Sequence, residues 1–320
     1  MNDPSPQPLV ALTGLMHEQA MATLKTFAAI RVADSPSPSD IVQAAAHASA
    51  LIVRHRLPDD ILARAPGLRV IVRHGTGLDF IPMREAFAAG VRVANVPEAN
   101  VQSVAEHVIG ILFMLSRRFD RQDRQVRAGN WNVRDEPRFE LNGKVLGLVG
   151  FGRIARRLAP LAMALGMKVL ACSRRGSYAD ISGVTGVTLD RLLSDSDFVS
   201  LHVPLTLETT HLIDARALAL IRPTAFLVNA ARGAIVDEGA LLDSLRNRRL
   251  AGAALDVFGE QPVRQIHPFT ALDNVILTPH SAALTEEAML RMGLQSVEEV
   301  RRALAGEASD NTISPSASAW

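Results

Sequence analysis

A short segment with two glycines in the middle of the chain has the spacing of a phosphate-binding turn. An apolar run, Val145–Val149, leads into Gly150, Gly152 and Ala155, in the pattern G-x-G-x-x-A. Gly150 would permit a tight turn, Gly152 would let the backbone approach a pyrophosphate, and Ala155 would let a helix pack closely on its strand. The helix predicted over Ile154–Leu165 would direct its free N–H groups at that anion. The pattern therefore predicts a dinucleotide-binding turn rather than a plain strand-to-helix connection.

The end of the next predicted strand bears on which dinucleotide binds. NAD sites commonly place an acidic residue about 20 residues after the turn, where it bonds the ribose 2′-hydroxyl. Here the strand Val169–Cys172 is followed by Ser173, Arg174 and Arg175, with no acid among them. A hydroxyl and two guanidinium groups favour a 2′-phosphate. We therefore expect NADP(H), and NAD(H) remains the alternative if both arginines are merely solvated.

Two residues with the chemistry to act on an organic acid also follow predicted strands. Arg232 comes shortly after Phe226–Asn229, and His280 comes shortly after Val275–Leu277. Parallel α/β sheets bind ligands at the carboxyl ends of their strands. A guanidinium can hold a carboxylate through two hydrogen bonds, and an imidazole can donate a proton near neutral pH. Together they could bind a 2-oxo acid and protonate its carbonyl oxygen.

The elements that must position these residues form two series of strands separated by helical stretches. This alternation predicts the α/β class with parallel sheets covered on both faces. The first series is Leu9–Leu12, Ala50–Arg54, Val70–Arg73 and Val91–Ala94. The second series is Val145–Val149, Val169–Cys172, Phe198–Val203, Phe226–Asn229, Ala253–Val257 and Val275–Leu277, which suits a doubly wound sheet.

Three other stretches complete the organisation of the chain. Val104–Arg118 has apolar residues at nearly every inward position and predicts a long, largely buried helix. Arg121–Glu140, which carries Trp131, is polar and poor in periodicity, so we expect a surface loop or a subunit contact. The Ser/Ala/Pro-rich tail from Ala308 is expected to be disordered.

Composition excludes several classes of function. The 320 residues suffice for two domains, and a net charge of +1 provides no field for nucleic acid or an anionic membrane. A single cysteine, Cys172, excludes a disulfide framework or a Cys-rich zinc site within one chain, and we expect no metal. The most apolar helical run, Val108–Leu115, is far shorter than the roughly 20 residues of a membrane span. With no signal-peptide pattern at the N-terminus, we expect a soluble, cytoplasmic protein.

Several motifs in the same order resemble the D-isomer-specific 2-hydroxyacid dehydrogenases, the group that includes phosphoglycerate dehydrogenase and glyoxylate/hydroxypyruvate reductase. The resemblance covers roughly Leu51 to Arg302. Besides the glycine turn, its segments are Val72–Asp79, Asn100–His107, His202–Thr206, Asn229–Gly233, Ala254–Phe258 and Asn274–His280. Several motifs in one order are far more specific than any one alone.

The resemblance implies two Rossmann-like, doubly wound domains. A flavodoxin-like substrate domain would comprise residues 1–99 and 287–320, and a dinucleotide-binding domain would comprise residues 100–286. It also implies a homodimer made through the cofactor domains, with the substrate bound in a cleft between the domains of one chain.

The resemblance further implies roles for individual residues. Arg232 would bind the substrate carboxylate and His280 would donate the proton. The loop Gly75-Thr76-Gly77 would contact the substrate. Arg54 and Arg73, at strand ends of the same domain, either read the far end of the substrate or are surface charges. We assign no role to His74 or His107, which we expect near the cleft.

The expected cofactor contacts also follow from the glycine turn and the resemblance. Asp256 would hold the nicotinamide carboxamide, and Val203 and Pro204 would line the cofactor cleft. The full set is Gly150, Phe151, Gly152, Arg153, Ile154, Ser173, Arg174, Arg175, His202, Val203, Pro204, Thr209, Ala230, Ala231 and Asp256.

One position departs from the family pattern. The family has a glutamate directly before the proline that follows Asp-Val-Phe-x-x, and its charge raises the pKa of the histidine. Counting from Asp256 places Gln261, and not Glu260, at that position. Either Gln261 partners His280 without supplying a charge, or Glu260 swings in as a substitute; we favour Gln261.

The sequence therefore predicts an oxidoreductase that transfers a hydride between NADP(H) and a small 2-oxo or D-2-hydroxy acid, of the glyoxylate/hydroxypyruvate or the phosphoglycerate type. The alternative is a cofactor-sensing binding protein, like the corepressors that resemble this family, without significant turnover. A formate dehydrogenase is a lesser rival, because that group typically has glutamine near the histidine.

Overall fold

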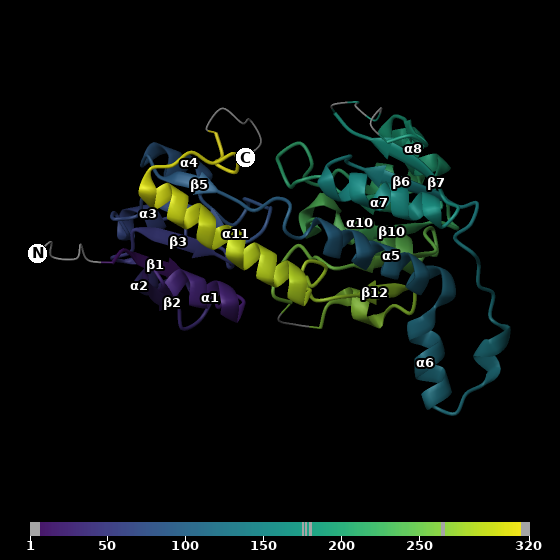
Figure 1. The fold of residues 1–320 in the computed structure, drawn as a ribbon. Coiled ribbons are helices and arrows are strands. Elements are labelled where there is room, and N and C mark those ends of the chain that lie inside the picture. The colour runs from purple at the N-terminus through teal and green to yellow at the C-terminus, as the bar shows by residue number, and fades with distance from the viewer. Residues whose placement is uncertain (1–6, 175, 177, 179–180, 264–265, 315–320) are drawn as a thin grey trace, which may run out of the picture. The chain divides into compact units, whose positions relative to one another are not determined.

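The computed structural model describes residues 7–174, 176, 178, 181–263 and 266–314, and the chain divides into two compact units (Figure 1). The first unit is Met1–Asn100 together with Leu284–Trp320, and the second is Val101–Ala283. The sequence places the two crossings after residues 99 and 286, which is one and three residues from these boundaries. The first unit is therefore built from both ends of the chain.

The first unit contains a parallel sheet whose five strands, over the described residues, run in the order β2-β1-β3-β4-β5. This is the flavodoxin-like order 2-1-3-4-5, which confirms the predicted fold. The strands are β1 (Leu9–Leu12), β2 (Ala29–Val32), β3 (Ala50–Val53), β4 (Val70–Arg73) and β5 (Arg92–Ala94). The sequence analysis missed β2, an edge strand whose residues alternate between exposed and half-buried and which therefore lacks a continuous apolar run.

Alternate residues of these strands face two helical layers. Leu51 and Ile71 pack with α2, α3 and α4, whereas Ile52 and Val72 pack with α1 and α11. The helices are α1 (Glu18–Lys25), α2 (Pro38–Ala45), α3 (Ile61–Arg64), α4 (Met83–Ala88) and α11 (Glu286–Ala305). Both faces of the sheet are thus buried, as the near-continuous apolar strands require.

The second unit contains a larger parallel sheet, in which seven strands of the described chain run in the order β12-β11-β10-β9-β6-β7-β8. Read from β6, this is the doubly wound order 3-2-1-4-5-6 with one further strand, and the order reverses between β6 and β9. The strands are β6 (Val145–Val149), β7 (Lys168–Cys172), β8 (Val184–Gly186), β9 (Phe198–Leu201), β10 (Phe226–Asn229), β11 (Gly252–Leu255) and β12 (Val275–Leu277). Ligands bind at such a reversal, so the fold places a candidate site at the carboxyl ends of β6 and β9.

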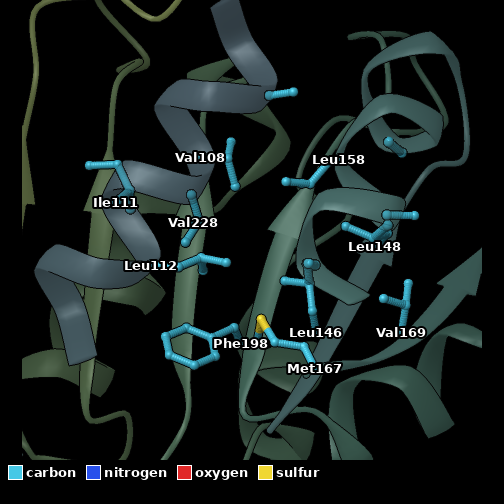
Figure 2. Packing of buried hydrophobic residues seen from close by; sticks show 14 of the residues in the cluster. Val108, Ile111, Leu112, Leu146, Leu148, Leu158, Met167, Val169, Phe198 and Val228 are labelled. Carbon is cyan, nitrogen blue, oxygen red and sulfur yellow. The ribbon is translucent and has the colours of Figure 1, made fainter. Parts of the chain in front are cut away.

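Helices cover both faces of this sheet as well. On one face α5 packs beside α7, and Figure 2 shows Val108 and Leu112 of α5 in one apolar layer with Leu148 and Leu158. On the other face lie α8, α9 and α10. The helices are α5 (Val101–Arg117), α6 (Phe119–Arg127), α7 (Arg153–Ala164), α8 (Leu189–Asp195), α9 (Ala215–Leu220) and α10 (Glu238–Arg246), and the 3₁₀ helices are η1 (Asn132–Asp135), η2 (Gly233–Ile235) and η3 (Pro268–Ala271). Within the described ranges, every helix is too short or too polar to cross a bilayer.

The polar stretch after α5 is not simply a loop, as one reading of the sequence had it, because α6 extends into it as far as Arg127 and η1 follows. None of the α6 residues is buried, and Figure 1 shows the helix extending away from the sheet of the second unit. Ion pairs Asp120–Arg124 and Asp123–Arg127, each 2.9 Å long, join successive turns of the helix. Only Phe119 and Val126 are apolar in α6, so the sequence lacks the closely repeated apolar positions from which a helix is predicted.

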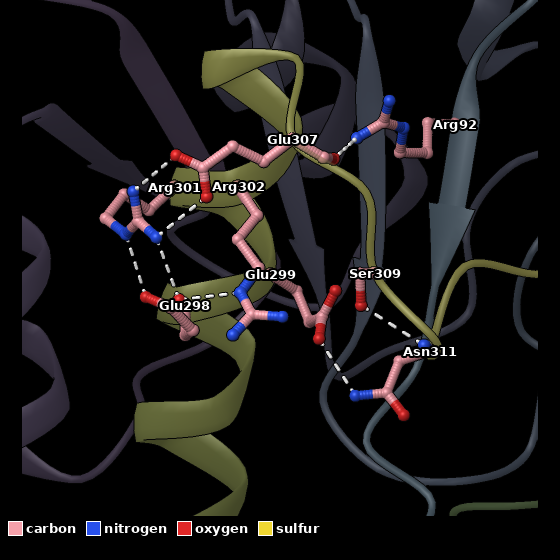
Figure 3. Close-up of polar contacts among 8 residues, drawn as sticks. All are labelled: Arg92, Glu298, Glu299, Arg301, Arg302, Glu307, Ser309 and Asn311. Atoms are coloured by element: carbon pink, nitrogen blue, oxygen red, sulfur yellow. Dashed lines mark hydrogen bonds and ion pairs between the residues drawn. The ribbon is translucent and has the colours of Figure 1, made fainter.

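The expectation of a disordered tail is wrong for residues 308–314. These residues lie along β5: Ile313 donates its N–H to the Val93 carbonyl at 2.8 Å, and Thr312 pairs with Ala94 in an antiparallel bridge. Figure 3 shows two side-chain bonds that hold this segment, from Arg92 to the Glu307 carbonyl and from Asn311 to Glu299. The tail therefore covers the open edge of the first sheet, which composition alone could not reveal.

Candidate active site

The carboxyl ends of β10, β11 and β12 are tied together by main-chain hydrogen bonds that continue beyond the strands. The Asp256 N–H donates to the Asn229 carbonyl at 2.9 Å, and the His280 N–H donates to the Asp256 carbonyl at 2.7 Å. Because the three strands are neighbours in the sheet, the segments carrying Arg232, Asp256 and His280 leave it side by side.

The carboxylate of Asp256 holds the turn that carries His280. Asp256 is only 2% exposed, and its Oδ1 accepts the Thr278 hydroxyl at 2.6 Å and the Ser281 N–H at 2.8 Å. Its Oδ2 accepts the Ala282 N–H at 3.0 Å. Three donors within five residues of chain thus converge on one buried carboxylate, which stabilises the charge and fixes the turn.

His280 itself has a left-handed backbone, with φ of 54°, and its ring contacts Gln261. The distance from His280 Nδ1 to Gln261 Oε1 is 2.8 Å. With the amide oxygen as acceptor, Nδ1 carries a proton, so Nε2 is the nitrogen that gains or loses a proton in this arrangement. Of the two candidates next to each other in the sequence, the structure brings Gln261 to the ring, and an amide adds no charge there.

The segment before Gln261 is held on both sides. Gly259 donates its N–H to Glu238 Oε1 at 2.8 Å. Gly233 lies so close to Phe258 that an added Cβ would overlap the Phe258 carbonyl carbon. Because Gly233 directly follows Arg232, this close approach links the Arg232 segment to the segment that carries Gln261.

Arg232 is half-buried and extended, and the buried side chain of Asn229 organises its segment. Asn229 accepts the Ala231 N–H at 3.1 Å and donates to the Arg232 carbonyl at 2.9 Å. The guanidinium donates from Nη1 to the Ala231 carbonyl at 2.7 Å. Ala230 and Ala231, both expected to contact the cofactor, are half-buried in the same segment.

The glycine turn has the geometry that a dinucleotide requires. Gly150 has φ of 91°, and a Cβ there would lie 2.6 Å from the His202 carbonyl oxygen, so a side chain is excluded. A Cβ on Gly152 would meet no atom within 4 Å, so the backbone there faces open space at the start of α7. Space at Gly152 and N–H groups at the helix start fit a pyrophosphate.

The residues next to the turn differ in burial and in hydrogen-bond or ion-pair partners. The Phe151 ring is buried and packs on Tyr178, with ring centres 5.3 Å apart, so only the Phe151 backbone faces the turn. Ile154 is half-buried and Arg153 is exposed at the first position of α7. Ser173 donates its N–H to the Tyr178 hydroxyl at 2.7 Å. Arg174 forms an ion pair with Glu208, and Arg175 lies outside the described residues.

The segment after β9 provides the opposite wall of the turn. His202 lies 2.9 Å from the Ser200 hydroxyl through Nε2, and burial lowers the pKa of His202 to about 4, so the ring is neutral near pH 7. Thr209 donates from its hydroxyl to the Pro204 carbonyl at 2.6 Å and thereby closes a turn. Val203 is half-buried next to this turn.

In the first unit, the glycine loop Gly75-Thr76-Gly77 is braced by Arg73. Gly75 has φ of 137°, which favours glycine. The Arg73 guanidinium donates to the Gly77, Val53 and His74 carbonyls and lies over the Phe80 ring. Arg73 therefore supports the loop from its own domain, a structural task that neither sequence-based reading of this arginine included.

Two more residues of the first unit, Arg54 and His74, have pKa values that burial lowers. Arg54 is half-buried, donates to the Leu15 carbonyl, and has a pKa lowered by burial. His74 is buried, and burial together with Arg54 and Arg73 lowers the pKa of His74 to about 3. His74 is thus a neutral packing residue near pH 7. In the second unit, His107 lines a small cavity with Asn229, Asp256 and Thr278.

Several of these contacts could not be expected from the sequence. Tyr178, Glu208, Glu238 and the Asn229 side chain all hold segments of the site, yet none lies in a spacing that predicts its partner. Of these four residues, only Asn229 lies in a motif that the sequence analysis singled out, because it begins the segment that contains Arg232.

The comparisons with known proteins agree on one family. The family model described as "D-isomer specific 2-hydroxyacid dehydrogenase, NAD binding domain" matches residues 109–282. An (S)-sulfolactate dehydrogenase of Chromohalobacter salexigens is 41% identical over 305 residues, covering 92% of this chain and 98% of that protein. A D-3-phosphoglycerate dehydrogenase of Mycobacterium leprae is 38% identical over 304 residues, covering 94% of this chain. The chain spans only 57% of the length of that mycobacterial relative.

Solved structures agree in fold and differ in cofactor. The NADPH-dependent glyoxylate/hydroxypyruvate reductase of Sinorhizobium meliloti, in complex with NADP and malonate, has a TM-score of 0.87 at 26% identity and covers 96% of this chain and 97% of that chain. The D-lactate dehydrogenase of Aquifex aeolicus, in complex with NAD and lactic acid, has a TM-score of 0.87 at 27% identity and covers 96% of this chain and all of that chain. The fold therefore accompanies either dinucleotide.

The contacts of Asp256 generate a prediction about stability. Asp256→Asn should lower the free energy of unfolding of the second unit by roughly 2 kcal/mol or more, because the amide group would face a backbone donor. Thr278→Val, which removes one donor, should cost about 1 kcal/mol. Urea unfolding followed by circular dichroism measures both. Thr278→Ser, which retains the hydroxyl, serves as the control. An Asp256→Asn protein no less stable than Thr278→Val would contradict the proposed role of the Asp256 carboxylate in holding the His280 turn.

Proposed function

Because the chain belongs to the D-isomer-specific 2-hydroxyacid dehydrogenase family, we propose that it interconverts a small 2-oxo acid and its D-2-hydroxy acid with a nicotinamide dinucleotide. The observation that carries this proposal is the arrangement on neighbouring strand ends of Arg232, a cation for the carboxylate, and His280, whose Nδ1 is held by Gln261. The glycine turn supports the cofactor, since space and helix N–H groups coincide at Gly152.

The chemistry divides between these residues. A bound nicotinamide supplies or accepts the hydride. Arg232 binds and orients the carboxylate, and its charge polarises the neighbouring carbonyl. His280 donates a proton to the carbonyl oxygen from Nε2 during reduction, because Nδ1 is occupied by Gln261. Asp256 acts on this step through its hold on the His280 turn, besides its expected contact with the carboxamide.

We propose NADP(H) as the preferred dinucleotide. Ser173 and Arg174 follow β7 where an NAD enzyme commonly has an acid, and a guanidinium suits a 2′-phosphate. For the substrate, Arg54 and the Gly75–Gly77 loop would contact the acid, and Arg54 would recognise its far end. This leaves two substrate types, glyoxylate or hydroxypyruvate on one hand and a phosphoglycerate-like acid on the other.

A panel of 2-oxo acids tests the activity. Glyoxylate, hydroxypyruvate and phosphohydroxypyruvate are offered with NADPH and with NADH, and cofactor oxidation is followed by absorbance. We expect turnover of at least one acid, and Arg232→Gln should lower kcat/KM by about 100-fold or more because a charged partner of the carboxylate is lost. Arg249→Gln changes an exposed arginine of the same unit and should have little effect.

A second candidate function, a cofactor-sensing binding protein, is favoured by one observation: His280 has an amide and not a carboxylate beside it. Binding of NADPH without turnover of any acid in the panel would support that function and contradict the enzyme.

The amide at position 261 generates a prediction about pH. Gln261→Glu would place a carboxylate against the His280 ring, which stabilises the imidazolium and raises the His280 pKa by roughly one unit or more. Reduction requires the protonated ring, so the fall of kcat at high pH should move upward by a similar amount. A pH–rate profile measures the shift. Glu260→Gln, which removes the neighbouring charge, should leave the profile in place, whereas superimposable profiles for the wild type and Gln261→Glu would refute the assigned partner.

We also propose a homodimer in which residues 118–140, the polar stretch that follows α5, contribute to the contact. Phe119, Val126 and Trp131 project apolar surface from this stretch, and Trp131 is 67% exposed. Aromatic residues of this kind are enriched in protein interfaces. Their exposure in a single chain supports a covering partner.

The corresponding prediction concerns mass in solution. Light scattering coupled to size exclusion should give twice the mass of one chain, and Trp131→Ala should shift the population toward the monomer at low concentration. Leu207→Ala changes another highly exposed apolar residue of the same unit and should leave the mass unchanged. A wild-type protein that runs as a monomer at all concentrations rules out the dimer.

A further inference from the structure

The arginine that follows β7 already has an anionic partner in this structure. Arg174 Nη1 lies 2.6 Å from Glu208 Oε2, and their side chains are 73% and 70% exposed. The two residues are 34 positions apart in the sequence, so their contact is a product of the fold. The guanidinium expected to read a 2′-phosphate is therefore engaged by a carboxylate of the same chain.

The position of this pair relates it to the cofactor. Arg174 lies just beyond β7, and Glu208 lies in the segment that follows β9. In the sheet, β6 lies between β9 and β7, and Gly150 follows β6 directly. The ion pair consequently joins the segments on either side of the strand that leads into the glycine turn, at the end of the sheet where the order of strands reverses.

The main chain next to Arg174 is held in place. The Ser173 N–H is bound by the Tyr178 hydroxyl, and the Tyr178 ring packs on Phe151 in the glycine turn. Tyr178 thus links the main chain directly before Arg174 to the glycine turn, while the Arg174 side chain itself is 73% exposed. An exposed ion pair is weak and is exchanged readily for another anion.

We propose that Glu208 is a specificity-determining residue that opposes NADPH: its carboxylate occupies the Arg174 guanidinium, which a ribose 2′-phosphate must take over. This proposal rests on the cofactor assignment of the proposed function and deepens it. A ligand with a 2′-phosphate displaces Glu208 and bears the cost of that displacement. A ligand with a 2′-hydroxyl has no anion for Arg174 and leaves the pair intact.

The test uses nucleotides that lack nicotinamide, so that it does not depend on turnover. Adenosine 2′,5′-bisphosphate and 5′-AMP are titrated by calorimetry into the wild type and Glu208→Gln. The proposal expects Glu208→Gln to bind the bisphosphate about two- to fivefold more tightly, as fits the modest strength of an exposed pair, while 5′-AMP affinity changes less than the bisphosphate affinity. The gain should diminish at high salt, which screens the pair.

Two controls separate this effect from a general change in charge. Glu140→Gln removes one exposed carboxylate elsewhere in the second unit and should not change the ratio of the two affinities. In an Arg174→Gln background, Glu208→Gln should bring no further gain, since the two residues act through one contact. Intact NADPH and NADH, titrated in the same way, should give the same ratio.

Four results would overturn the proposal. Weaker bisphosphate binding by Glu208→Gln would mean that Glu208 orients Arg174 for the phosphate. An equal gain for both nucleotides, or a gain that persists without Arg174, would mean a non-specific charge effect. If the wild type binds neither nucleotide nor either intact cofactor, the cofactor assignment of the proposed function fails, and this proposal with it. If the protein turns over no acid but shows the expected ratio of nucleotide affinities, the Glu208 proposal holds and the proposed enzymatic activity fails.

Discussion

The buried carboxylate of Asp256 is the contact on which the rest of the candidate site depends. It accepts three hydrogen bonds from the turn that carries His280, and its main chain joins that turn to Asn229. Asn229 in turn orders the segment of Arg232. The proposed proton donor and carboxylate binder are thus positioned by one continuous set of hydrogen bonds, and not by independent loops. A buried anion with fewer donors would be costly, so the carboxylate and its turn stabilise each other.

The parts of this site that could be predicted from the sequence are those with a local cause. Gly150, Arg232 and His280 each come shortly after a run of apolar residues, and such runs form the interior strands of parallel sheets. The carboxyl ends of these strands meet at one edge of the sheet, so catalytic or binding residues that follow the strands come together there. This can be inferred without knowing how the side chains pack. The register of Gln261 is equally local, because it is counted from Asp256 along a short segment.

What could not be predicted depends on residues far apart in the chain or on elements without an apolar pattern. Glu208 reaches Arg174 only because β6 separates β9 from β7 in the sheet. The edge strand β2 and the helix α6 bury too little surface to leave a periodic pattern. The tail beside β5 looks disordered by composition, yet main-chain bonds to β5 and side-chain bonds from Arg92 and Asn311 hold it, and their partners lie far away in the sequence or outside any predictive pattern.

The use of both chain ends by the first unit imposes an order on synthesis. Val297 and Val300 of α11 cover the sheet face formed by Ile52 and Val72, and Ile313 binds the edge at β5. These partners leave the ribosome some two hundred residues after the strands they cover, whereas the second unit is contiguous and can fold as soon as it emerges. The nascent N-terminal sheet must therefore wait with an apolar face and an open edge uncovered.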